Sequence, residues 1–236
     1  MSDSDKKRGR YLECALSLPV LEAGHRVAAL DAPTEDKSRL LEIALREHVS
    51  ELDAATKTKL TVSRVWLNPP RSAERMIRWA VDNPHHFYDH RIMHAGALLA
   101  TYPFIGSVFT VLGRAFALGS STFAVDVRNR SVDLWGGSTA VVHGTSKAIT
   151  SLKRLDLITG GGRSPIVAGS PMEVESQAAS WLIHSALLTR DQEAIDTYEA
   201  LDIPELFWAN LVDPSADYPF LEKHQEGMNR TVWTIR

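Results

Sequence analysis

Two predicted helices joined by a pair of glycines constrain the fold of this chain more than any other feature. They lie in residues 121–169, where the segment TFAVDVRNRSVDLW has Thr122 as a suitable helix cap and Gly136-Gly137 as its stop. The second helix, STAVVHGTSKAITSLKRLDLI, is capped by its first serine or threonine and carries apolar residues at steps of three and four. Two short apolar runs then flank GGGRSP and predict a β-hairpin whose tip carries Arg163.

The periodicity of these helices predicts which side chains face the core. In the first helix we expect the inward residues to be Val125, Val132, Leu134 and Trp135. In the second helix the inward stripe consists of Val142, Thr145, Ile149, Leu152 and Leu155. The side chains left facing outward are His143, Lys147, Ser151 and Arg154. An apolar helix over residues 102–119 completes a unit of three helices and a hairpin at residues 103–170.

A helix, a glycine turn, a second helix and a glycine-tipped hairpin together resemble the winged-helix family of nucleic-acid-binding domains. The resemblance implies that the second helix enters the major groove of double-stranded DNA while nearby cations reach phosphates. The local charge favours contact with DNA phosphates, because residues 121–170 carry six basic and three acidic side chains, a net charge of +3 in a chain of net charge −3. The expected DNA-contacting residues are Arg128, Arg130, His143, Lys147, Ser151, Lys153, Arg154 and Arg163.

A winged helix also serves as a protein–protein module, and this alternative stays open. A local net charge of +3 is modest beside that of strongly basic DNA-binding domains. The second helix also lacks asparagine and glutamine, the residues that read adenine best, so Lys147 or Arg154 would have to read guanine. In the alternative, the same surface holds a partner protein without touching DNA.

The segments before this unit predict a helical region at residues 11–102. We expect a helical piece at residues 11–18 that ends at Pro19, and further helices in the segments SRLLEIALREHVSELD and RSAERMIRWAVD. The β-branched residues of 56–70 favour a strand or an irregular crossing. Residues 1–10 form a basic arm that either follows a DNA backbone or is a solvated terminus.

Three histidines are the main candidates for a metal site. We expect Asn83-Pro84 to open a helix over residues 85–102, which places His86, His90 and His94 on one face, and two histidines at i and i+4 can share a zinc ion. The alternative is a polar face whose histidines contact Asp89 or nearby backbone. Since no HExxH motif or cysteine cluster accompanies them, we expect no metal, and a hydrolase centred on His86 and His90 is the weakest hypothesis.

Searches for catalytic motifs also return nothing that defines an enzyme. The chain has no GxxxxGK[ST] phosphate loop and no GxSxG elbow, and its three consecutive glycines suit a hairpin tip better than an anion cradle. We therefore expect a non-enzymatic protein that uses no cofactor.

The segment at residues 171–236 predicts an acidic helical region that ends in a hairpin turned at 227–229. Residues 171–223 carry eleven acidic and two basic side chains, a net charge of −9, so we expect this part to stay away from DNA. Such a block is either a solvated face or a surface for a basic partner. The expected domains are therefore residues 1–10, 11–102, 103–170 and 171–236.

The order of a helical region followed by a wing unit is similar to that of small accessory proteins from bacterial anti-phage defence islands, and resembles the BrxA family of BREX systems. The segments behind this resemblance are TYPFIGSVFTVLGRAFAL, STAVVHGTSKAITSLKRLDLI and SWLIHSALL. The resemblance implies a mainly α-helical DNA-binding or scaffold subunit that works beside larger enzymes. A single cysteine, Cys14, the lack of a signal peptide and the lack of ~18 consecutive apolar residues predict a cytoplasmic protein without a membrane span.

Overall fold

The computed structural model describes residues 11–119, 121–226 and 230–236, and its fold is mainly helical, as the sequence predicts. The longer helices are α2 (Leu18–Ala28), α3 (Thr34–Leu45), α4 (Leu52–Trp66), α5 (Arg71–Asp82), α6 (His90–Thr101), α7 (Pro103–Ala117), α8 (Ala124–Trp135), α9 (Thr139–Arg154) and α10 (Ser176–Arg190). The short helices are η1 (Pro84–His86), α11 (Thr197–Ala200) and η2 (Pro204–Leu206). The strands are β1 (Ile158–Gly161), β2 (Ser164–Ala168), β3 (Met172–Glu173), β4 (Ala194–Asp196), β5 (Ala209–Asn210), β6 (Leu221–Glu226) and β7 (Arg230–Ile235). The basic arm at 1–10 and the turn expected at 227–229 lie outside the described residues.

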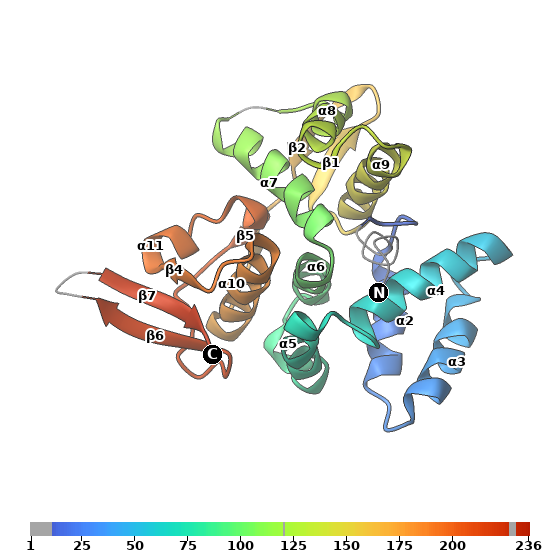
Figure 1. The fold of residues 1–236 in the computed structure, drawn as a ribbon, viewed down its shortest axis with the longest axis horizontal. Coiled ribbons are helices and arrows are strands. Elements are labelled where there is room, and N and C mark those ends of the chain that lie inside the picture. The colour runs from blue at the N-terminus through green and yellow to red at the C-terminus, as the bar shows by residue number, and fades with distance from the viewer. Residues whose placement is uncertain (1–10, 120, 227–229) are drawn as a thin grey trace.

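Helices α6 and α10 pack against each other near the centre of the molecule, although the whole of α7, α8, α9 and the β1–β2 hairpin separates them in sequence (Figure 1). Both are buried on nearly every side, α6 from Ile92 onward. Gly96 permits the close approach, because a Cβ atom there would lie 1.9 Å from Cζ3 of Trp181. The Trp181 indole in turn donates a hydrogen bond to the Met76 carbonyl at 3.3 Å, which ties α5 to the same centre.

The N-terminal helices surround one side of this pair, with α2 packed against α3, α4 and α6. The C-terminal strands lie on the other side of the molecule, where β7 pairs with both β4 and β6 in an antiparallel sheet (Figure 1). That pairing confirms the expected terminal hairpin as far as its two strands are described. A continuous hydrophobic core joins residues from the N-terminal helices, the central helices and the C-terminal region.

The unit expected at residues 103–170 folds as three helices and a hairpin. Helix α8 packs on α7 and α9, and β1 pairs with β2 in the antiparallel hairpin that the glycines predict. Thr122, in the connection between α7 and α8, forms a bridge with Ile166 of β2 through backbone hydrogen bonds of 3.1 and 2.6 Å. The connection before the helix pair is thereby fixed to the hairpin after it.

The faces of α8 differ from those expected. Val125 and Leu134 are 52% and 64% exposed, whereas Val127 is fully buried. Thr122 does not cap the helix, because its backbone pairs with β2 and the cap position belongs to Phe123. Of the expected inward residues, Val132 and Trp135 do pack against the core, so apolar spacing identified the helix and half of its stripe but missed how narrow the buried face is.

Three elements of the N-terminal half also differ from prediction. The segment expected as a strand or crossing at 56–70 is mostly α4, because its β-branched side chains, including Thr58, Thr61, Val62 and Val65, recur at helical steps and face the core. Residues 11–17 are not helical, and Pro19 lies in the first turn of α2, where a proline is tolerated. The helix expected over 85–102 begins only at His90, where the Asp89 side chain accepts a hydrogen bond from the Arg91 amide.

Each helix in the described part of the chain is too short or too polar to span a lipid bilayer by itself. Helices α6 and α7 have the length and composition of a membrane span only when taken together, and the chain bends by 116° between them. Both helices are largely buried in this structure.

Candidate nucleic-acid interface

The exposed face of α9 is the most cationic helical surface of the unit at residues 103–170. Ser138 begins the helix by accepting a hydrogen bond from the Val141 amide at 3.4 Å, as the sequence predicts. The opposite face is buried by residues such as Val141, Ala148 and Leu152. From His143 onward the exposed residues recur at helical steps and are His143, Ser146, Lys147, Lys153 and Arg154, with Thr150 half-buried beside them.

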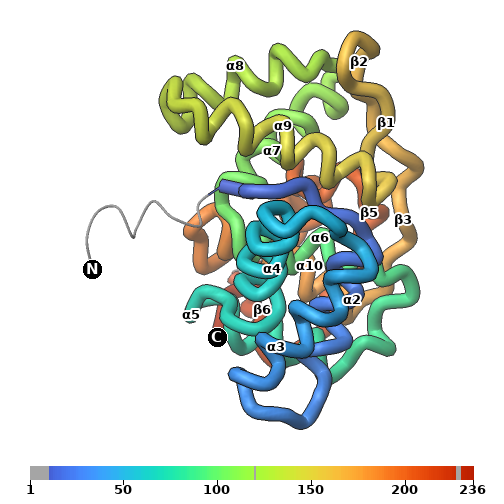
Figure 2. The backbone as a smooth tube through the Cα atoms, turned by 90° about the vertical axis from the view of Figure 1, so that its right-hand side faces the viewer, coloured from blue at the N-terminus to red at the C-terminus, as the bar shows by residue number. Residues whose placement is uncertain are grey.

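The first described residues of the chain border one edge of this face. They run beside α9 in Figure 2, between α9 and α4. The Leu16 amide donates to the Ser151 hydroxyl at 2.9 Å, and the Arg154 guanidinium donates to the Ala15 carbonyl at 3.2 Å. Tyr11 begins this contact near Gly144, where an added Cβ would lie 3.2 Å from Cβ of Tyr11.

The hairpin borders the other edge. A Cβ on Gly161 would lie 3.8 Å from Cδ of Lys153, so the end of β1 lies beside the exposed face of α9. Arg163 is exposed between the two strands, as the sequence predicts. The backbone turns there through glycines with positive φ, including +79° at Gly160 and +67° at Gly162, which other residues rarely adopt.

Ser151 does not face outward, and this expectation is wrong. The residue is only 1% exposed. Its hydroxyl accepts from the Leu16 amide and donates to the Lys147 carbonyl at 2.8 Å. Ser151 therefore fastens the N-terminal segment to α9 and has no access to a nucleic acid.

The two arginines of α8 add little to the cationic surface. Arg130 is exposed, but Asp126 and Asp133 lie four residues before and three residues after it on the same helix. Arg128 is half-buried, and its Nε has no hydrogen-bond partner among the described residues. Helix α8 thus carries no net charge, and the positive excess belongs to α9 and the hairpin.

The cations of α9 and the hairpin are not neutralised by nearby acids. Among the described residues, Lys147, Lys153, Arg154 and Arg163 form no ion pair, whereas Arg190 of α10 is paired with Glu205. Asp156 is the acid that follows α9 directly, and its carboxylate lies 3.5 Å from the Arg91 guanidinium. A polyanion would therefore meet four cations whose charges remain available.

The hydroxyl groups on the exposed face are already committed as donors. Ser146 donates to the Val142 carbonyl at 3.2 Å, and Thr150 donates to the Ser146 carbonyl at 2.8 Å. Thr150 was missed in the sequence, although it lies four residues after Ser146 and seven after His143. Both hydroxyls can still accept hydrogen bonds, but they offer no further proton to a base or phosphate.

Of the three histidines considered for metal binding, His86 lies apart, whereas His90 and His94 both contact Glu22. His86 belongs to η1 and stacks on Trp79 at 5.4 Å, so it does not share a helix face with His90 and His94. Nδ1 of His90 lies 2.8 Å from the Glu22 carboxylate, while His94 is completely buried. Contact with His94 and His90 lowers the pKa of Glu22 to about 2, against the opposing effect of burial. The described residues contain no group of three or more ligands that could hold a metal ion.

Comparisons of the chain with protein-family models, with curated proteins and with solved structures give no significant match.

Proposed function

We propose that this protein binds double-stranded DNA through the exposed face of α9 and the adjoining hairpin, in the manner of a winged helix. The observation that carries the proposal is a set of four cations on one surface that form no ion pair within the described part of the chain: Lys147, Lys153, Arg154 and Arg163. Phosphate contacts of this kind supply most of the affinity of a protein for DNA. His143 lies exposed on the same face.

The topology supports the same proposal. Three helices followed by a hairpin, with the connection before α8 bridged to β2 at Thr122 and Ile166, is the arrangement expected of a winged helix. In that arrangement α9 is the helix that enters the major groove, and Arg163 lies where a wing reaches the backbone or the minor groove.

The chemistry of the face favours contacts with the backbone over the reading of bases. The exposed part of α9 has no asparagine or glutamine, and its two hydroxyls donate to the helix itself. Lys147 is the side chain best placed to approach a guanine, because the guanidinium of Arg154 is already bonded to Ala15. We therefore propose binding with little sequence preference.

Binding of a random-sequence duplex, titrated against salt by fluorescence anisotropy, tests this proposal. If four cations each neutralise one phosphate, the slope of log K against log salt is about −3.6, and Lys147→Gln/Lys153→Gln reduces it to about −1.8. Between 50 and 200 mM salt the affinity then falls by about 150-fold for the wild type and about 12-fold for the double variant.

The matched control is Arg39→Gln/Lys57→Gln, which removes the same charge from exposed positions on α3 and α4. This control should keep the wild-type slope. Folded wild-type protein that does not bind duplex at low salt would overturn the proposal, as would equal slopes for the two double variants.

A protein-docking role is the second candidate, and the exposed apolar side chains at the start and end of α8 favour it. Phe123, Val125 and Leu134 are 43%, 52% and 64% exposed. In this case the protein would be a scaffold subunit, such as an accessory subunit of a defence system, and Val125→Ser/Leu134→Ser would weaken partner capture without changing the salt slope on DNA.

A further inference from the structure

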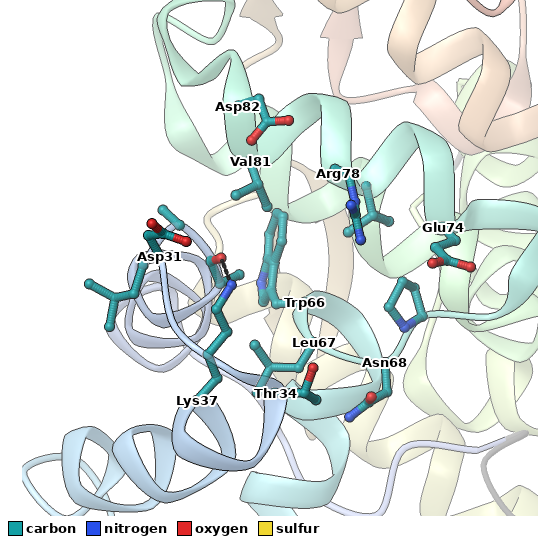
Figure 3. A pocket seen from close by; sticks show the side chains of 15 residues that line it. Asp31, Thr34, Lys37, Trp66, Leu67, Asn68, Glu74, Arg78, Val81 and Asp82 are labelled. Atoms are coloured by element: carbon teal, nitrogen blue, oxygen red, sulfur yellow. Dashed lines mark hydrogen bonds between the residues drawn. The ribbon is translucent and has the colours of Figure 1, made fainter.

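A cleft of about 610 Å³ lies in the N-terminal region, away from α9. It is formed where α2 ends, α3 begins and α4 ends, with α5 along one side (Figure 3). Its volume is within the range of small-molecule sites in proteins, roughly 300–1,000 Å³. The proposed DNA-binding function does not use this cleft.

The wall of the cleft contains a buried donor that has no acceptor. Trp66 is only 3% exposed, and its indole Nε1 has no hydrogen-bond partner among the described residues. In Figure 3 the indole nitrogen is turned toward the side chain of Lys37. The Lys37 ammonium donates one hydrogen bond, to the Ala28 carbonyl at 2.7 Å, and its other two protons have no acceptor among the described residues. The Trp66 indole and the Lys37 ammonium therefore face the same place, and neither has an acceptor there in the described part of the chain. A buried donor without an acceptor lowers the stability of the folded state.

Further donors converge on the same cleft. Thr34 and Lys37 both line it, so the start of α3 lies at its edge, where the first amides of a helix have no partner within the helix. The guanidinium of Arg78 forms no ion pair in the described part of the chain and points into the cleft in Figure 3. The acids in the first turn of α3, Glu35 and Asp36, do not line the cleft. These groups together suit a carboxylate or a phosphate.

Three acids also line the cleft, and they restrict the ligand further. Asp31, Glu74 and Asp82 lie around the donors in Figure 3. With Lys37 and Arg78 they give the lining a formal net charge of −1, which opposes a simple anion. A ligand that carries an ammonium group beside its acidic group satisfies both sets of side chains.

From these observations we propose that the cleft binds a small zwitterion, with its carboxylate or phosphate at Trp66, Lys37 and the start of α3. Its ammonium group contacts one of the surrounding acids. Two probes represent the shared chemistry: glycine, which carries a carboxylate, and phosphoethanolamine, which carries a phosphate. Acetate lacks the ammonium group, and ethylamine lacks the acidic group.

The test is a titration of the full chain with each probe, followed by tryptophan fluorescence and thermal unfolding. We expect glycine or phosphoethanolamine to bind saturably and more tightly than acetate or ethylamine. Trp66→Phe keeps an aromatic ring but removes the indole N–H, and Lys37→Gln removes the ammonium. Each variant should weaken binding by roughly tenfold or more, because each removes a hydrogen bond to a charged group. Lys57→Gln, an exposed charge change on α4, should leave binding unchanged.

Two results would overturn the proposal. One is the absence of saturable binding by either zwitterion to folded wild-type protein. The other is binding that Trp66→Phe and Lys37→Gln leave unchanged when thermal unfolding shows that both variants are folded. Acetate that binds as tightly as glycine would contradict the role of the acids.

Discussion

Ser151→Ala is the substitution that best tests whether the Ser151 side chain is buried, as in the structure, or faces outward, as the sequence predicts. The Ser151 hydroxyl accepts from the buried Leu16 amide at 2.9 Å and donates to the Lys147 carbonyl. Alanine leaves the Leu16 N–H without its acceptor in a place that water does not reach, since Leu16 is fully buried. The variant should therefore lose stability by the penalty of an unsatisfied buried donor.

The size of the loss follows from two opposing effects. An unsatisfied buried amide costs about 1–3 kcal/mol. Alanine also favours a helix over serine by about 0.5 kcal/mol, so the net loss is about 0.5–2.5 kcal/mol. For a chain of this length, that loss lowers Tm by roughly 1–10 °C.

The control is Ser146→Ala on the same helix, where the hydroxyl is exposed and donates to the Val142 carbonyl. Thermal unfolding by circular dichroism should show a Tm close to or slightly above that of the wild type for Ser146→Ala, and a clear decrease for Ser151→Ala. Duplex binding by folded Ser151→Ala should equal that of the wild type. An unchanged Tm together with weakened duplex binding would refute this reasoning and restore Ser151 to the interface.

Two further outcomes are expected. Gly160→Ala should lower Tm more than Gly162→Ala does, and should also weaken duplex binding. Both glycines have positive φ, but a Cβ at Gly160 would lie 1.9 Å from the Pro165 carbonyl oxygen, whereas a Cβ at Gly162 would meet nothing within 4 Å. Equal Tm values for these two variants would show that the hairpin tolerates the clash. Burial, aided by the charge of His94, lowers the pKa of His25 from 6.5 to about 4, so the unfolded chain takes up this proton first as the pH falls. The contribution of His25 to the free energy of unfolding is thus complete above pH 6.5 and is lost as the pH falls toward 4. The Tm of His25→Asn should therefore fall less than that of the wild type over this interval. Parallel curves of Tm against pH for the two proteins would contradict the lowered pKa of His25.

Much of the fold around α9 could be predicted because its signals are local. Ser138, one of the two residues expected as the cap, caps α9; the glycines end α8 and turn the hairpin, and the inward residues Ile149, Leu152 and Leu155 are buried. A cap, a turn and an apolar stripe each depend on residues only a few positions apart. The exposure of Lys147 and Arg163 followed from the same patterns.

The role of Ser151 depended on a partner that the local sequence does not contain. Ser151 occupies a helical position next to the exposed face. It is covered by the segment at Leu16, which lies 135 residues earlier in the chain and packs against it. Arg154 is bonded to the same distant segment. Contacts of this kind set which polar residues of a helix remain free, and periodicity does not record them.

The error at α4 has a different cause. The β-branched residues there favour a strand when considered singly, but their spacing suits a helix, and burial of Val62 and Val65 outweighs the small difference in propensity. The cleft beside Trp66 was not predicted at all. Its lining comes from four helices and their connections, so no single stretch of sequence carries its pattern.

The pairing of α6 with α10 also bears on the order in which the chain folds during synthesis. Helix α6 leaves the ribosome about 90 residues before α10 is complete, which at 5–20 residues per second is roughly 5–18 s. During that interval the place of Trp181 beside Gly96 is empty, and the side of α6 that packs on α10 is uncovered. The segment from α7 to the hairpin is made in the meantime and has its own local contacts. We therefore expect the segment from α7 to the hairpin to fold in the nascent chain before α6 and α10 can pack together. The chain is most prone to misfolding during this interval, while the side of α6 that packs on α10 is uncovered.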